Sequence, residues 1–122
     1  MKAHLSGSQD FQKVYRHGTR HDGDSLTAFV LPNELSHHRL GVTASRKAIG
    51  NAVQRNRAKR LLRETFRLSE GSLQQLRKKY DWVLNAKGRL LLNKTSNVLV
   101  EFEKILDTVA SQEAEESGLQ VA

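Results

Sequence analysis

The sequence predicts an α+β fold in which about three helices pack on one small central β-sheet. Three segments repeat apolar residues every three or four positions, as amphipathic helices do, and three shorter segments alternate apolar with polar residues, as strands do. A chain of 122 residues, 38% of them hydrophobic, is long enough for one domain with one modest core. We therefore expect one domain over residues 1–110 and an acidic flexible tail over residues 111–122.

The first helix is expected over residues 9–17, with Ser8 as its N-cap. Phe11, Val14 and Tyr15 share one face of this helix, because they are spaced three and four positions apart. Val14 is expected in the core. For Phe11 and Tyr15 two interpretations stay open: core packing, or an exposed platform on which single-stranded bases stack.

The alternating pattern predicts three strands: Ser25–Leu31, Arg39–Ala44 and Tyr80–Ala86. A polar turn is expected over residues 21–24, before the first of them. The first two strands are separated by a short loop and are expected to pair antiparallel. Trp82 is expected in the core, whereas Phe29 is either core or a further exposed aromatic.

A longer helix begins at about Ala52, where Asn51 supplies an N-cap and Gln54 stands at the second position of a capping box. At about 100° per residue its side chains separate into two faces. The apolar face contains Ala58, Leu61, Leu62, Thr65, Phe66 and Leu68. Arg55 points toward this face, but it lies in the first turn, from which a long side chain reaches past the helix end.

The other face of this helix and the residues before it are strongly basic. One acid, Glu64, stands against eight cations: Arg46, Lys47, Arg55, Arg57, Lys59, Arg60, Arg63 and Arg67. Cations beside the positive end of a helix dipole lower stability unless an anion such as phosphate binds there. We therefore predict an anion site built from a strand end and a helix N-terminus; a basic helix without a ligand is the alternative.

The remaining segments complete the order helix, strands, helix, strand, helix. A loop with a short helical piece around residues 73–78 is expected before the third strand. The last helix is expected from Thr95 or Ser96 to about Ala110. Its buried stripe consists of Val98, Leu99, Phe102, Ile105, Leu106 and Val109.

Charge favours a polyanionic partner, because the formal net charge is +7 and the isoelectric point is near 10.1. Nucleic acid is the first candidate and a membrane surface the second. No apolar run approaches the ~20 residues that span a bilayer, and the N-terminus lacks the apolar block of a signal peptide. A cytoplasmic location is therefore expected.

The sequence does not predict an enzyme with its own catalytic centre. It has no cysteine, no paired-carboxylate motif and no glycine-rich phosphate loop, and His37 and His38 lack a third metal ligand at suitable spacing. A nucleic-acid-binding protein is the better prediction. Duplex DNA read by a recognition helix competes with folded RNA, but a strand and a turn, not a first helix, are expected before the basic helix.

The run SRKAIGNAVQRNRAKR over residues 45–60 resembles the signature of the bacterial ribonuclease P protein subunit: a basic pair, a glycine, A-V-x-R-N and then K-R. Residues 10–18 resemble the first helix of that family, and residues 39–42 resemble its strand before the motif. Residues 80–86 stand where the family has its last strand. The chain then reads NAKGR over residues 85–89, where the family usually has an Ala-Arg run.

The resemblance implies an αβββαβα sandwich like the second domain of ribosomal protein S5, with a left-handed βαβ crossover through the basic helix. It implies an accessory subunit of an endoribonuclease, a hydrolase whose catalyst is a large RNA. In that family Mg²⁺, bound mainly by the RNA subunit and the substrate, supports removal of the 5′ leader from precursor tRNA. The implied partners are ribonuclease P RNA and precursor tRNA, with no membrane, and the protein is expected as a monomer within the holoenzyme.

The resemblance also implies binding roles for individual residues and no catalytic residue in the protein. The residues expected to contact the catalytic RNA are Arg46, Lys47, Arg55, Asn56, Arg57, Lys59, Arg60, Arg63 and Arg67. Phe11, Tyr15 and Phe29 are expected to line the cleft that holds the single-stranded leader.

Overall fold

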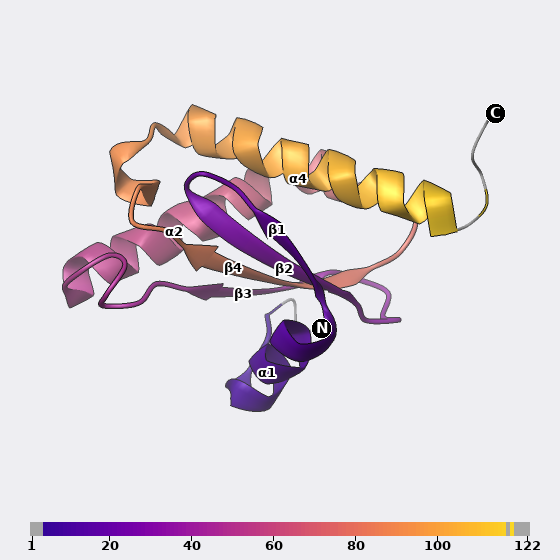
Figure 1. The fold of residues 1–122 in the computed structure, drawn as a ribbon, viewed down its shortest axis with the longest axis horizontal. Coiled ribbons are helices and arrows are strands. Elements are labelled where there is room, and N and C mark those ends of the chain that lie inside the picture. Colours follow the sequence, from indigo (N-terminus) through magenta and orange to yellow (C-terminus); the bar gives the residue numbers. More distant parts are fainter. Residues whose placement is uncertain (1–3, 117, 119–122) are drawn as a thin grey trace.

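Helices on both faces of one four-stranded sheet form the fold of the computed structural model, which describes residues 4–116 and 118. The elements are, in chain order, α1 (Gly7–His17), β1 (Thr19–Asp22), β2 (Leu26–Pro32), β3 (Arg39–Thr43), α2 (Ala52–Leu68), α3 (Glu70–Gln74), β4 (Tyr80–Ala86), the 3-10 helix η1 (Leu90–Leu92) and α4 (Thr95–Glu116). Helices α2 and α4 cover one face of the sheet and α1 lies on the other (Figure 1). The predicted α+β sandwich is confirmed, with one strand more than the residues indicated.

The strand order in the sheet is β1-β2-β4-β3. The expected antiparallel pairing of the second and third strands, β2 and β3, is therefore wrong, because β4 lies between them. In the registers of β4 with its neighbours, Trp82 stands opposite Val30 of antiparallel β2 and opposite Leu40 of parallel β3. The central place suits β4, because the adjacent Val83 and Leu84 point to opposite faces and are both fully buried. The parallel β3–β4 pair needs a crossover connection, and α2 lies in it.

β1 is the strand that the sequence did not indicate, since a polar turn was expected over residues 21–24. Its four residues are polar and mostly exposed, so they show no apolar alternation. The strand is held by backbone pairing with β2, in which Thr19 stands opposite Val30 and Asp22 opposite Thr27. Strand pairing, and not hydrophobicity, therefore determines this edge of the sheet.

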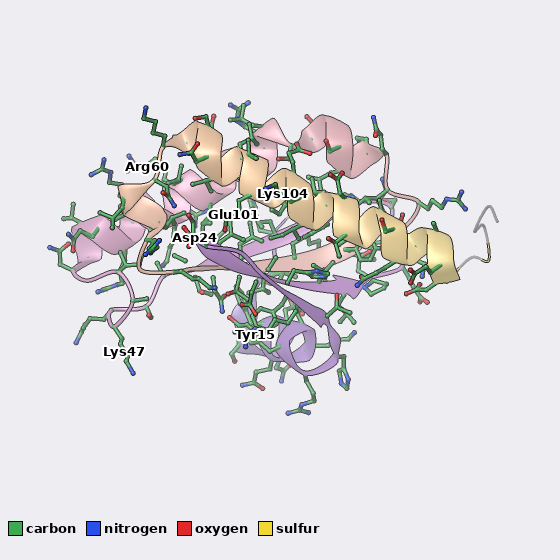
Figure 2. The ribbon with its side chains drawn as sticks, turned by 45° about the horizontal axis from the view of Figure 1, so that its top comes forward. Tyr15, Asp24, Lys47, Arg60, Glu101 and Lys104 are labelled. Atoms are coloured by element: carbon green, nitrogen blue, oxygen red, sulfur yellow. The ribbon has the colours of Figure 1, made fainter. Side chains whose placement is uncertain are left out.

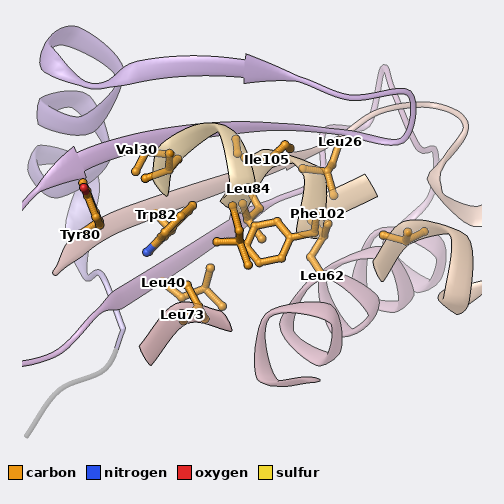
Figure 3. Close-up of a cluster of buried hydrophobic side chains, with 14 of the residues drawn as sticks. Leu26, Val30, Leu40, Leu62, Leu73, Tyr80, Trp82, Leu84, Phe102 and Ile105 are labelled. Carbon is orange, nitrogen blue, oxygen red and sulfur yellow. The ribbon is translucent and has the colours of Figure 1, made fainter. Parts of the chain in front are cut away.

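The main core lies between the sheet and helices α2 and α4 (Figure 3). Trp82 is fully buried, as predicted, and its ring centroid lies 5.7 Å from that of Phe102 and 6.1 Å from that of Phe66. Leu62 of α2 is also fully buried. Leu68, which the helical pattern placed on the apolar face, is 47% exposed, because α2 ends there.

Two helix boundaries differ from the prediction. Ser6, and not Ser8, occupies the N-cap position of α1, and its backbone N–H donates to Oδ2 of Asp10 at 3.2 Å. Ser8 lies inside the first turn of the helix. The short helix after α2 is α3, which begins and ends earlier than the piece expected over residues 73–78.

The last helix is longer than expected, because α4 continues to Glu116. Residues 111–116, which were assigned to a flexible tail over 111–122, therefore belong to the helix. Residues 117 and 119–122 of the predicted tail lie outside the described residues.

Glu113 fixes the added turns of α4 to the rest of the protein. Its side chain is almost fully buried, although it is a carboxylate. It accepts hydrogen bonds from the backbone N–H of Arg77 at 2.9 Å, from the backbone N–H of Lys78 at 3.0 Å and from the hydroxyl of Tyr80 at 2.5 Å. These donors satisfy the carboxylate, which otherwise would make burial costly.

Candidate nucleic-acid interface

The N-terminus of α2 has the predicted capping box. Oδ1 of Asn51 accepts from the backbone N–H of Gln54 at 2.9 Å, and Oε1 of Gln54 accepts from the backbone N–H of Asn51 at 3.2 Å. Gly50 precedes the cap with φ of 125°, and a Cβ there would stand 2.3 Å from Oε1 of Gln54. Only glycine suits both the backbone conformation and the space.

Arg55 reaches back past the start of α2, as the sequence indicated. Its side chain is half-buried, and Nη1 donates to the carbonyl of Gly50 at 2.7 Å. This hydrogen bond ties the guanidinium to the turn before the helix. Because arginine carries five N–H donors, the other donors stay available to an anion.

The predicted RNA-contacting residues line the turn at residues 46–49 and the length of α2. Most of their side chains are exposed: Arg46, Lys47, Asn56, Arg57, Arg60, Arg63 and Arg67; Arg55 and Lys59 are half-buried. Figure 2 shows Lys47 projecting away from the body of the protein. The structure therefore presents all nine on one helix and the turn that leads into it.

These cations are largely uncompensated. Within residues 4–116 and 118, only Arg67 of the eight forms an ion pair, to Glu64, with Nε 3.1 Å from Oε2. The hydrogen bonds from Arg67 lower the pKa of Glu64. The first turn of α2 contains no acid, so the positive end of the helix dipole lies beside unpaired cations. This is the electrostatic arrangement that favours a bound polyanion.

Two of the predicted leader-binding aromatics contact each other on the α1 face of the sheet. The rings of Tyr15 and Phe29 meet edge to face, with centroids 4.8 Å apart. Tyr15 is 38% exposed and Phe29 is half-buried. Cζ of Arg20 lies 5.7 Å from the centroid of Phe29, which adds a cation to the same surface.

Phe11 lies one turn before Tyr15 on the same face of α1, over the edge strand β3. A Cβ on Gly41 would stand 2.5 Å from Cζ of Phe11, so only glycine at this position lets the ring rest on the strand. Phe11 lines a cavity of about 280 Å³ together with Leu5, Val42 and Arg63. Phe11 and Phe29 pack against the same buried cluster of Leu5, Val14 and Val83, so the three aromatics lie on the same face of the sheet.

Asn85 links the aromatic surface to the carboxyl ends of β3 and β4. Its Oδ1 accepts from the hydroxyl of Tyr15 at 2.9 Å and from Oγ1 of Thr43 at 2.6 Å. Sequence reasoning left Asn85 and Arg20 out of the site. Asn85 shares the polar alternation of Asp81 in the same strand, a pattern that could have placed it on the face away from the core.

The segment after β4 departs from the family pattern, and the structure shows what it contacts. Nζ of Lys87 donates to the carbonyl of Gly23 at 2.6 Å, and Nη1 of Arg89 lies 3.5 Å from Oδ1 of Asp24. A Cβ on Gly88 would stand 3.2 Å from the carbonyl of Ala48, so this segment lies against the basic turn. Lys87 and Arg89 therefore lie near the basic turn, and their side chains contact the loop between β1 and β2.

No group of three or more His, Asp or Glu side chains in the described residues could hold a metal ion. His38 instead has a structural role. Its Nδ1 accepts from the backbone N–H of Tyr80 at 3.0 Å and from Nε1 of Trp82 at 3.1 Å, and its Nε2 lies 3.1 Å from the carbonyl of Leu73. Because Nδ1 accepts, the proton is on Nε2, and burial lowers the pKa of this imidazole.

The fold does not suit the recognition-helix rival to RNA. A helix-turn-helix protein needs a helix before its recognition helix, whereas β3 and a turn precede α2. None of the helices in the described part of the chain is both long and apolar enough to cross a bilayer.

Comparisons with known proteins identify the family. The sequence profile described as Ribonuclease P matches residues 1–110. The ribonuclease P protein component of Caldanaerobacter subterraneus subsp. tengcongensis is 35% identical over 112 residues, which cover 92% of this chain and 93% of that protein. The ribonuclease P protein component of Alkaliphilus metalliredigens is 41% identical over 69 residues, or 57% of this chain, and the match spans 61% of that protein, less than two thirds.

A solved structure agrees with the sequence relatives. The RNase P protein of Staphylococcus aureus matches this fold with a TM-score of 0.74 and 27% sequence identity, over 88% of this chain and 95% of that chain. The mixed sandwich with a four-stranded sheet is thus the fold of RNase P proteins. From its sequence and its fold, this chain belongs to the ribonuclease P protein family.

Proposed function

We propose that the protein is the protein subunit of ribonuclease P. It binds the catalytic RNA and the single-stranded 5′ leader of precursor tRNA, and it assists the Mg²⁺-dependent endonucleolytic cut that gives the mature 5′ end of the tRNA. The protein acts in the cytoplasm, as one copy within the holoenzyme. The observation that carries the proposal is the row of uncompensated cations along α2 in a chain of this family.

The catalytic RNA binds along α2 and the turn before it. Arg46 and Lys47 meet phosphates beside the free N–H groups of the helix N-terminus, and Arg55 and Arg57 continue the contact. Phosphate contacts replace condensed counterions on the RNA, so affinity depends strongly on salt. The role of α2 is therefore phosphate binding, and its apolar face keeps it fixed on the sheet.

The leader binds on the α1 face of the sheet. Unpaired bases stack on aromatic rings, and Tyr15, Phe29 and Phe11 supply rings that are partly accessible. Arg20 lies against Phe29 and can contact the backbone of the same strand. Extended single-stranded RNA suits this surface better than a duplex, whose base faces are covered by stacking.

Mg²⁺ would be held mainly by the RNA subunit and the substrate. There it would supply an activated water and charge stabilisation at the phosphate that is cut. The protein supplies no acid, base or nucleophile. It raises the local concentration of substrate, orients the leader and reduces repulsion between two RNA molecules by adding positive charge.

Reconstitution tests the proposal. The full-length protein, added to a bacterial ribonuclease P RNA and precursor tRNA at low Mg²⁺, should increase leader removal, and protein alone should remove none. Cleavage by the protein without RNA would overturn the division of labour. Tighter binding to duplex DNA than to the RNA at physiological salt would instead favour the recognition-helix alternative.

A further inference from the structure

A second cavity lies at the C-terminal end of α2 and contains none of the three predicted leader-binding aromatics. It has a volume of about 470 Å³ and lies between the loop before β3, the last turns of α2, and α3. Leu40, Phe66 and Leu73 form its apolar lining. Figure 3 shows Leu73 of α3 next to Leu40 of β3. We call this cavity the α2–α3 pocket; its size is typical of small-molecule sites.

The rim of the α2–α3 pocket is cationic. Arg63, Arg67 and Lys79 line it, against one carboxylate, Glu70. Arg67 is shared with Glu64, whereas Arg63 and Lys79 form no ion pair with any residue that the structure describes. Gln74 adds an amide that can donate and accept hydrogen bonds. Apolar walls with cations at the mouth match a flat ring that carries a phosphate, which is the chemistry of a nucleotide.

The wall of the pocket is held in place by His38. Through its two ring nitrogens it connects the loop before β3 to the carbonyl of Leu73 in α3 and to Tyr80 and Trp82 in β4. The rings of His38 and Tyr80 are also stacked, with centroids 6.0 Å apart. The pocket is therefore formed before any ligand arrives, which lowers the entropy lost on binding.

The α2–α3 pocket adjoins the cavity under Phe11. His4, Leu40 and Arg63 line both. The two cavities thus lie side by side near β3, and Arg63 lines both. An extended RNA strand across them can place a base in the pocket while its phosphates stay near the cations of α2.

We infer that the α2–α3 pocket binds one unpaired nucleotide of ribonuclease P RNA. The base of this nucleotide lies against Phe66 and Leu73, and its phosphate lies at Arg63 and Lys79. The inference rests on the proposed function, since it takes RNA as the partner of α2. A stacked duplex base cannot enter a pocket of this shape, so the nucleotide must be a bulged, looped or terminal one.

Two variants test the pocket, each with a neighbouring control. Ser36→Trp places a large ring at the exposed rim, and Leu35→Trp does the same one residue away, outside the lining. Lys79→Ala removes a rim charge, and Lys78→Ala removes an equal charge outside the lining. The Kd of the full-length protein for ribonuclease P RNA should rise about 5- to 150-fold for Ser36→Trp, the range expected when one stacked base is lost. Lys79→Ala should reduce the salt slope by about one and the two controls should not.

Arg57→Ala separates failure of the inference from failure of the proposed function. Normal RNA affinity in Ser36→Trp and Lys79→Ala, with weakened affinity in Arg57→Ala, would overturn the pocket and leave the RNA-binding role of α2 intact. Normal affinity in all three would overturn the proposed function. Thermal unfolding of Ser36→Trp and Arg57→Ala should match that of the parent protein, because Ser36 and Arg57 are exposed.

A mononucleotide distinguishes an RNA nucleotide from a free ligand. Adenosine and uridine 5′-monophosphates are titrated into the protein, with the backbone amide signals of Leu73 and Lys79 as the NMR readout. We expect weak shifts that disappear when ribonuclease P RNA is bound. Shifts that persist with RNA bound would mean a separate site for free nucleotides and would overturn the inference.

Discussion

Replacing Glu113 with alanine tests how the end of α4 is held, and we expect the free energy of unfolding to fall by about 3 kcal/mol. The carboxylate is 5% exposed and accepts from Arg77 N, Lys78 N and the Tyr80 hydroxyl. A hydrogen bond to a charged group contributes about 1.5–3 kcal/mol. Arg77 and Lys78 are exposed, so their N–H groups regain water in the variant, whereas the buried Tyr80 hydroxyl does not. The expected loss of about 3 kcal/mol thus equals the energy of one hydrogen bond to a charged group, from Tyr80, plus a fraction of the energy of the two backbone bonds.

Thermal unfolding measures this loss. With an unfolding entropy of about 2.1 cal/mol/K per residue, 3 kcal/mol corresponds to a Tm about 12 °C lower for a chain of 122 residues. Glu115→Ala is the matched control, because Glu115 is an exposed acid in the same helix, and it should change stability by less than about 0.5 kcal/mol. Combining Glu113→Ala with Tyr80→Phe should cost less than the sum of the two, since both remove the same hydrogen bond.

The stability due to Glu113 should also depend on pH. Burial alone would raise the pKa of Glu113, but hydrogen bonds from Tyr80, Arg77 and Lys78 outweigh it, and the pKa is lowered from its usual 4.5. A lowered carboxyl pKa stabilises the fold above the unfolded value and loses that effect as pH falls through the folded value. Equal Tm shifts for Glu113→Ala and Glu115→Ala would refute the reasoning. A loss of stability on Glu113→Ala that stays the same at acid pH would also refute it.

Three further predictions concern binding and acid stability. Arg57→Ala should weaken binding to ribonuclease P RNA and lower the salt slope by about one, whereas Lys104→Ala on α4 (Figure 2) should not; equal slopes would remove the phosphate contact. Phe11→Ala should weaken leader binding by about 1–3 kcal/mol in fluorescence titrations, whereas a purely structural role would lower Tm and leave affinity normal. Burial lowers the pKa of His38 below its usual 6.5, so the free energy of unfolding from urea titrations should fall as pH drops below 6.5 toward the folded value. His21 is shifted in the same direction, so the difference between the parent protein and His38→Gln isolates His38, and identical pH slopes would contradict its role.

The sequence predicted those elements whose defining interactions or patterns involve residues near one another in the chain. The start of α2 was predictable because Gly50, Asn51 and Gln54 are adjacent in sequence and form the capping box among themselves. β4 was predictable because its residues alternate around a buried Trp82. The order of the strands was not predictable from this alternation. The pattern shows which residues of a strand share a face, but not which strand lies beside it in the sheet.

Long-range contacts explain the errors. Glu113 stands in an acidic stretch, and its donors at Arg77, Lys78 and Tyr80 are more than thirty positions away, as the separations of 36, 35 and 33 show. Nothing adjacent to Glu113 distinguishes it from Glu115. β1 was missed for the same reason, because its polar residues become a strand only when β2 lies beside them.

The candidate site divides in the same way. The cations of α2 were predictable, because a helix of known phase determines which of its residues face outward. The edge-to-face contact of Tyr15 with Phe29 could not be, since the two rings meet only after α1 is placed on the sheet. Arg20 and Asn85 join this surface through β1 and β4 and carry no local signal for it.

The N-terminus of α2 balances stability against binding. Arg55 and Arg57 stand where the helix dipole disfavours cations, and no acid in the first turn offsets them. The fold compensates with neutral hydrogen bonds: the Asn51–Gln54 capping box and the bond from Arg55 to the Gly50 carbonyl. An acidic N-cap would stabilise the free protein more, but its charge would repel phosphate. The neutral asparagine cap therefore keeps the helix start folded while leaving its positive charge available to RNA.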